Sequence, residues 1–143
     1  WPYNQSKWAT RPSNAAYLDA LYRKVTGYAK CADYNAVKAA LAAGTPVIIG
    51  FTVYESFEEG TWANPANQGG TGLMPYPNVN TEAYLGGHAV CLVGYNDVTQ
   101  RFIARNSWGT SWGDRGYFYM PYRVIQDTTM SADFWTISAV TNP

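Results

Sequence analysis

The sequence predicts an α+β fold in which four to six antiparallel strands form one sheet and helices lie on its flank. Three stretches carry this prediction: a β-branched run at residues 47–53, an alanine-rich run at residues 33–44 and an apolar run at residues 89–93. The 143 residues are enough for one domain with a substantial core.

The first thirty residues predict a strand that is reached through a short helix. Residues 1–10 are expected to form an extended entry segment held by Trp1 and Trp8. Residues 11–14 are typical of a helix start, and the alanines and leucines after them favour a short helix. Residues 23–30 predict the strand.

The clearest helix and the clearest strand of the first half follow one another. The helix is predicted from Asp33, a favourable N-cap, to Gly44, which can adopt the left-handed conformation that ends a helix. The strand at residues 47–53 comes next. Residues 56–59 predict one helical turn, and residues 60–80 predict a long loop of the kind that is usually functional or partly mobile.

A hairpin is predicted in the second half. The apolar strand that starts at His88 reaches a turn at Asn96 and Asp97, and residues 101–105 predict the next strand. Two strands joined by a short loop pair antiparallel, so the end of the second lies beside the start of the first. This pairing brings Asn106 close to His88.

Two further strands are predicted at residues 116–120 and 133–137, with a turn at residues 121–125 after the first of them. The last segment is expected to close the sheet.

His88 is the single histidine of the chain. A lone histidine is more often a satisfied core residue than a reactive one, and the nearby tryptophans could equally be ordinary packing. Asn106 favours a reactive role. A catalytic imidazole needs one nitrogen free for a nucleophile and the other held by a fixed partner, and an Asn side-chain oxygen can hold it without adding charge.

The motifs HAV, VGY, NSWGTSWG and GY follow one another from His88 to Tyr117. With them the chain resembles the C-terminal half of the papain-like cysteine peptidases, and its ending resembles their bacterial and viral members. The resemblance implies the papain-like fold, mainly its antiparallel, barrel-like right-hand subdomain with flanking helices. Residues 1–143 would form the C-terminal half of a peptidase domain whose Cys-bearing N-terminal half is absent from this chain.

The resemblance also implies roles for individual residues. His88 and Asn106 would be catalytic. Trp108 would cover the hydrogen bond between them, where exclusion of water strengthens it. Trp112 would line the leaving-group side of the cleft.

Three small residues are implied as parts of the substrate cleft: Gly50, Gly87 and Ala89. Gly50 and Ala89 would lie opposite each other at the S2 pocket and leave it open to a bulky apolar side chain, although a strand glycine more often marks a bulge. Four glycines are expected to allow positive φ or close backbone approach: Gly86, Gly87, Gly109 and Gly113.

The cysteine nucleophile of this family, which lies near the mature N-terminus, has no counterpart in the sequence. Neither Cys31 nor Cys91 is followed by Trp or preceded by a suitable oxyanion-hole Gln. Cys31 lies two residues outside the helix that Asp33 caps, so the helix start is not expected to activate its thiol. Cys91 is expected to enter the core as a small apolar residue. No disulfide is expected between them.

These observations predict a partner. The chain begins Trp1-Pro2-Tyr3, which we interpret as the end of a piece cut from a longer polypeptide. An N-terminal polypeptide would carry the catalytic Cys and the oxyanion-hole Gln, and the assembled enzyme would act on peptide or protein substrates. The chain alone is expected to be inactive.

Composition argues against several other classes. Ten basic and ten acidic residues cancel without a basic cluster, so nucleic-acid binding has no electrostatic support. No apolar run approaches the ~20 residues of a membrane span. One histidine and two scattered cysteines form no metal-ligand cluster, and no cofactor is expected. Charged residues make up only 14%, which suggests that a partner covers some apolar surface. The compartment stays open, with secretion or a lysosome- or vacuole-like compartment allowed by the resemblance.

Three functions remain open. The first is a cysteine endopeptidase that needs a second polypeptide. The second is a papain-like binding or inhibitory module that has lost its nucleophile segment, in which His88 and Asn106 would be relics. The third is acyl transfer or deamidation by the same residues. The retained His, Asn and Trp favour the first, because a binding module has no need for an unshared imidazole.

Overall fold

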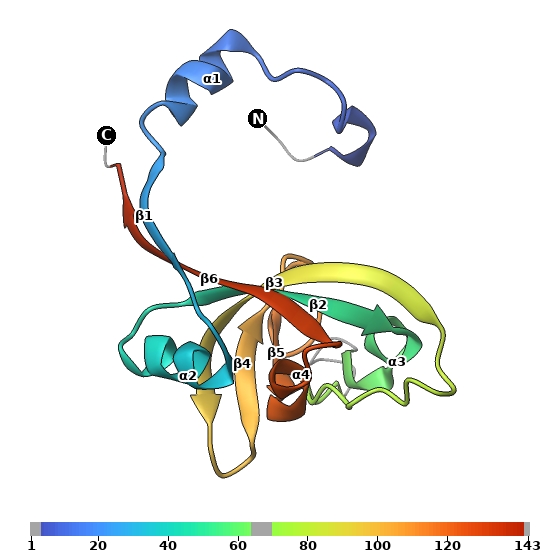
Figure 1. The fold of residues 1–143 in the computed structure, drawn as a ribbon. Helices are drawn as coiled ribbons and strands as arrows, with labels where there is room; N and C mark the ends of the chain where they lie inside the picture. Colours follow the sequence, from blue (N-terminus) through green and yellow to red (C-terminus); the bar gives the residue numbers. More distant parts are fainter. Residues whose placement is uncertain (1–3, 64–69, 142–143) are drawn as a thin grey trace.

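A computed structural model describes residues 4–63 and 70–141 and has the α+β fold that the sequence predicts (Figure 1). Its strands are β1 (Val25–Lys30), β2 (Val47–Tyr54), β3 (Tyr84–Asn96), β4 (Arg101–Arg105), β5 (Tyr117–Pro121) and β6 (Ser131–Val140). Its helices are α1 (Asn14–Ala20), α2 (Tyr34–Ala42), α3 (Glu55–Glu58) and α4 (Tyr122–Gln126), with 3₁₀ turns η1 (Gln5–Lys7) and η2 (Thr61–Ala63).

The strands form one antiparallel sheet in the order β1-β6-β2-β3-β4-β5. β3 is 13 residues long and pairs with β2 on one side and β4 on the other, so it is a long inner strand of the sheet. The resemblance implies a barrel-like subdomain, whereas the sheet of the described residues is open, with β1 and β5 at its edges.

One face of the sheet is buried under helices. β2 buries alternate residues, as the period of two along a strand requires: Val47, Ile49, Phe51 and Val53. Helices α2, α3 and α4 lie on this side of the sheet (Figure 1). Their buried side chains, among them Val37, Phe57 and Val124, complete the core.

Helix α2 begins and ends as the sequence predicts. The side chain of Asp33 accepts a hydrogen bond from the backbone N–H of Ala36 (2.9 Å), which satisfies one of the free donors at the helix start. Gly44 follows the helix with a φ of 79°, a left-handed conformation that favours glycine. These two ends fix where β2 starts.

Two predictions about the entry segment and the connection after β5 are wrong. Trp8 is 89% exposed and therefore does not hold the entry segment, which contains the turn η1 instead of extended chain. Trp1 lies outside the described residues. The turn predicted at residues 121–125 is helix α4, because three apolar side chains in it pack into the core: Tyr122, Val124 and Ile125.

The long loop before β3 is only partly described, since residues 64–69 lie outside the described chain. The predicted helical turn before it is confirmed as α3. At the start of the loop, η2 buries Trp62, whose Nε1–H donates a hydrogen bond to the carbonyl of Ser56 (2.7 Å). The start of this loop is therefore part of the core.

Replacing Asp33 with Ala should lower the free energy of unfolding by about 1 kcal/mol, because α2 loses its N-cap and carries buried Val37 and Leu41. The matched control is Ser13→Ala, which removes the N-cap of α1, a helix without buried residues. Urea unfolding of both variants measures the difference. Equal losses would contradict the assignment of α2 to the cooperative core.

Candidate active site

His88 lies on β3, on the face of the sheet that carries the core. It pairs in register with Phe51 of β2, and its ring centroid lies 5.9 Å from that of Phe51 and 6.1 Å from that of Phe57. The side chain is half-buried at the end of the core. Two phenyl rings therefore limit where the imidazole can turn.

Asn106 follows β4 directly, and the hairpin brings it to His88 as the sequence predicts. Its backbone N–H donates to the carbonyl of Gly116 (2.9 Å), and only 7% of the residue is exposed. Its side-chain Oδ1 lies 2.8 Å from Nε2 of His88. The backbone hydrogen bond positions Asn106, and its side chain in turn positions the imidazole of His88.

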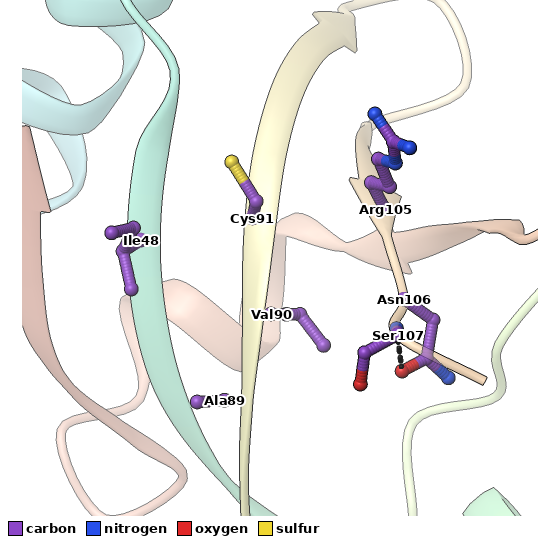
Figure 2. A pocket seen from close by; sticks show the side chains of 7 residues that line it. All are labelled: Ile48, Ala89, Val90, Cys91, Arg105, Asn106 and Ser107. Carbon is purple, nitrogen blue, oxygen red and sulfur yellow. Dashed lines mark hydrogen bonds between the residues drawn. The ribbon is translucent and has the colours of Figure 1, made fainter. Parts of the chain in front are cut away.

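The protonation of the neutral imidazole follows from this geometry. Oδ1 of Asn106 also accepts a hydrogen bond from the backbone N–H of Ser107 (2.8 Å), which identifies this atom as the acceptor (Figure 2). Nε2 of the neutral His88 ring must therefore carry the proton and donate a hydrogen bond to Oδ1 of Asn106. Nδ1 then keeps its lone pair and can accept a proton from a nucleophile.

Trp108 packs against this pair. Its ring centroid lies 5.0 Å from that of His88, with the two planes 33° apart, while 41% of the residue stays exposed. Trp112 stands nearly perpendicular to Trp108 at 5.2 Å and also packs on Phe57. Trp112 is half-buried and belongs to the edge of the core.

Three of the four glycines expected to need unusual backbone geometry have positive φ: Gly86, Gly109 and Gly113. The most demanding is Gly113, where a Cβ would lie 2.4 Å from the carbonyl oxygen of Tyr117. Gly87 has no positive φ. The loop that carries both tryptophans therefore requires glycine at two positions.

Gly50 and Ala89 pair in register on β2 and β3. Ala89 lines a pocket of about 420 Å³ beside Asn106 (Figure 2). Gly50 instead borders a smaller hollow next to Ala132 on β6. The pocket is lined by Ile48, Ala89, Val90, Cys91, Arg105, Asn106 and Ser107.

The two cysteines are both free. Cys31 is buried at the end of β1, outside helix α2, as expected. The prediction that Cys91 enters the core is wrong, because Val90 and Leu92 take the core side of β3 and Cys91 faces the pocket. Burial raises the pKa of both thiols, and for Cys91 the nearby Arg105 acts weakly in the opposite direction.

Sequence reasoning missed the aromatic residues under the site. Phe57 touches His88, Trp108 and Trp112, and Trp62 packs on Phe57 and Trp112. Phe57 lies in α3, directly after β2, and Trp62 lies in η2, at the start of the long loop. Their signal in the sequence is only that they are large apolar residues in an otherwise polar stretch.

The described residues hold no group of three or more His, Cys, Asp and Glu side chains that could bind a metal ion. Within the same residues, no helix is long and apolar enough to span a bilayer.

An imidazole that a carboxamide holds beside an indole, with one ring nitrogen free, has the geometry to take up and return the proton of a side-chain nucleophile. The chain belongs to the papain family of cysteine proteases, because the sequence model of that family, described as papain family cysteine protease, matches residues 1–136. This confirms the resemblance and the class of thiol protease.

Individual relatives agree. A peptidase C1-like protein of Acanthamoeba polyphaga mimivirus, itself uncharacterized, is 37% identical over all of this chain and 47% of that protein. A cathepsin B-like protein of Giardia intestinalis is 34% identical over 83% of this chain and 36% of that protein. The chain therefore spans about half the length, or less, of the relatives it matches.

Solved structures agree with the fold. Xylellain, a cysteine protease from Xylella fastidiosa, superposes with a TM-score of 0.77 and 38% identity, over 94% of this chain and 47% of that protein. Bromelain from Ananas comosus superposes with a TM-score of 0.52 and 20% identity, over 83% of this chain and 51% of that one, and shares the fold.

At alkaline pH, where an imidazole is neutral, the ring proton of His88 should reside on Nε2, because Asn106 offers an acceptor there. Two-bond ¹H–¹⁵N correlation spectra distinguish the two tautomers. In Asn106→Ala the same proton should exchange rapidly with water. A proton on Nδ1 in the unmodified chain would contradict the assigned geometry.

Iodoacetamide should alkylate both cysteines slowly at pH 7, because burial raises their pKa and leaves little thiolate. The rates should climb as the pH passes above the ordinary thiol range, and Cys91 should react faster than buried Cys31. Peptide mass mapping measures both sites, with urea-unfolded chain as the control in which they react alike. Rapid reaction of Cys31 at pH 7 would contradict the burial of its thiol.

Proposed function

We propose that this chain provides the acid–base half of a cysteine endopeptidase, and that a second segment provides the catalytic Cys and the oxyanion-hole Gln. The observation that carries the proposal is the 2.8 Å contact between His88 and Asn106, which leaves Nδ1 available to a thiol. Membership of the papain family supports the reaction class. The raised pKa of both thiols argues against a nucleophile from within the chain.

In the proposed reaction, Nδ1 of His88 takes the proton of the incoming thiol. The thiolate attacks the carbonyl carbon of the peptide bond, and the C–N bond breaks as the imidazolium returns its proton to the leaving amine. A water molecule then attacks the thioester while His88 accepts its proton. The C–S bond breaks, and the carboxylic acid leaves.

Asn106 would act on the imidazole in every step. Its Oδ1 accepts a hydrogen bond from Nε2–H and carries no charge, so it holds the ring angle in both protonation states of the imidazole. Trp108 would shield this bond from water, which strengthens it in a lower dielectric. Phe51 and Phe57 restrict the ring from the other side.

The substrate side of the proposal involves Gly50, Gly87, Ala89 and Trp112. Ala89 lines the pocket beside Asn106 and would contact the substrate there. Gly50 pairs with it across the strands. Trp112, behind Trp108, would support the leaving-group side rather than form its surface, since it is half-buried.

The test uses a chimera in which the part of xylellain that this chain does not match is fused ahead of residue 1. The chimera should cleave peptides, and an epoxide inhibitor of cysteine peptidases should label a Cys of the xylellain part. His88→Ala should lower kcat/KM at least about 100-fold, the scale of general acid–base catalysis. Asn106→Ala should cause a smaller loss, because the imidazole remains.

The matched control is Asn80→Ala, which removes an exposed amide in the loop before β3. It should leave kcat/KM unchanged. Inhibitor mass on Cys31, or full activity of the His88→Ala chimera, would overturn the proposal. A folded chimera that binds peptides without cleaving them would favour the non-catalytic binding module instead.

A further inference from the structure

Helix α3 is the short element that places Phe57 under the candidate active site. It has four residues, and Phe57 is the buried one among them. The centroid of this phenyl ring lies 6.1 Å from that of His88 and 5.6 Å from that of Trp108. A helix of one turn has little stability of its own. The position of Phe57 therefore depends on the contacts that hold α3 from outside.

The cap of α3 comes from a distant part of the chain. Tyr54 precedes the helix, but its side chain makes no capping hydrogen bond. Glu82, in the loop before β3, takes this role. Its Oε2 accepts a hydrogen bond from the backbone N–H of Ser56 (2.9 Å), although the two residues are 26 positions apart. One of the free donors at the start of α3 is thereby satisfied.

The same carboxylate also closes its own loop. Oε1 of Glu82 accepts a hydrogen bond from the backbone N–H of Asn78 (2.7 Å), and the backbone N–H of Glu82 donates to the carbonyl of Asn78 (2.9 Å). The segment that contains this turn passes α3 on its way to β3 (Figure 1). Both carboxylate oxygens are therefore used, one on the helix and one on the loop.

Glu55 forms the matching contact in the opposite direction. Its Oε2 accepts a hydrogen bond from the backbone N–H of Ala83 (2.9 Å), and its backbone N–H donates to the carbonyl of Ala83 (3.2 Å). Ala83 directly precedes β3, the strand of His88. We call the four residues of this double contact the clasp: Glu55, Ser56, Glu82 and Ala83. The clasp joins the helix that carries Phe57 to the strand that carries His88.

Ser56 is held at both of its backbone polar groups. Glu82 binds its N–H, and its carbonyl accepts a hydrogen bond from Nε1–H of Trp62 (2.7 Å). Phe57 is the next residue, so these two bonds fix the direction in which its ring leaves the backbone. The ring packs on three indoles: Trp62, Trp108 and Trp112.

Glu82 is ionised at neutral pH. Partial burial raises the pKa of its carboxyl, but the hydrogen bonds from Ser56 and Asn78 together outweigh this effect, so the pKa lies below its ordinary value. A hydrogen bond to an ionised acceptor is stronger than one to a neutral acceptor. The cap on α3 therefore has its full strength at pH 7.

We infer that Glu82 is a positioning residue of the active site: by capping α3 it fixes Phe57, and Phe57 limits the movement of the His88 and Trp108 rings. This inference rests on the proposed function, because it gives Glu82 a part in the acid–base step. None of the four clasp residues lines the pocket beside Asn106. Loss of the cap should therefore impair the chemical step and leave substrate binding unchanged.

The first test follows the ring proton of His88 in this chain without any nucleophile. Glu82→Ala should make the Nε2 proton exchange with water about tenfold faster, because local opening of the site becomes easier. The ¹H–¹⁵N spectra used above for the tautomer measure this exchange. Glu82→Gln should fall between, because one carboxamide oxygen replaces only one of the two carboxylate acceptors.

Two controls separate positioning from general stability. Glu58→Gln removes an exposed negative charge from α3 outside the clasp and should leave the exchange unchanged. Asp33→Ala removes the N-cap of α2 and lowers the stability of the whole chain. It should likewise leave the exchange of the His88 proton unchanged under conditions where the chain stays folded.

A double-mutant cycle tests the route through Phe57. Phe57→Leu removes the ring and should also accelerate the exchange. If Glu82 acts through this ring, adding Glu82→Ala to Phe57→Leu should have a much smaller effect than Glu82→Ala alone, because the effects of coupled residues do not add. Additive effects would overturn the assigned route.

The chimera described above tests the effect on catalysis. Glu82→Ala should lower its kcat about tenfold and leave KM unchanged, because the imidazole is misplaced while the substrate pocket is intact. Unchanged proton exchange in Glu82→Ala, or an equal acceleration in Asp33→Ala, overturns the positioning role and leaves the proposed function intact. Faster exchange in Glu82→Ala, with a chimera whose activity survives His88→Ala, supports the hold on the ring and refutes the proposed function.

Discussion

The register between β3 and β4 is the constraint on which the site depends. Asn106 reaches His88 because a short turn returns the chain, and because Cys91 pairs with Arg105. A slip of one residue would turn every side chain of β4 to the opposite face and carry Asn106 away from the imidazole. Burial of Phe102 and Ala104 on one face of β4 specifies the register, so core packing determines the geometry of the His88–Asn106 pair.

The sequence predicts the strands around the site well, because their apolar patterns are strong and short turns join them. It predicts the pairing of His88 with Asn106 for the same reason. Prediction from the sequence fails where contacts between distant segments determine the local structure or the exposure of a side chain. Helix α4 depends on burial of its apolar side chains against the sheet. Trp8 stays exposed, although a large indole side chain favours burial. The sequence places Cys91 on the wrong face because an unbroken apolar run does not show which alternate residues face the core.

The hydrogen bonds of the Asn106 side chain show that the protein fixes the orientation of this amide. Its Oδ1 has two donors, whereas its Nδ2 is buried without an acceptor among the described residues. Leaving a buried donor unpaired costs about 1–3 kcal/mol. The chain tolerates this because turning the amide over would place Nδ2 against the backbone N–H of Ser107, where two donors face each other. The unsatisfied nitrogen therefore accompanies a carboxamide whose orientation is set before any substrate arrives.

The face of the sheet away from α2, α3 and α4, where Ile48 and Ile137 are exposed, also affects the behaviour of the separate chain in solution. Ten positive and ten negative residues leave a formal net charge of zero at pH 7, and the isoelectric point is about 6.8. Near that pH, copies of the chain repel one another little while their apolar strand surfaces remain accessible. Colloidal solubility should therefore be lowest at neutral pH and improve on either side of it.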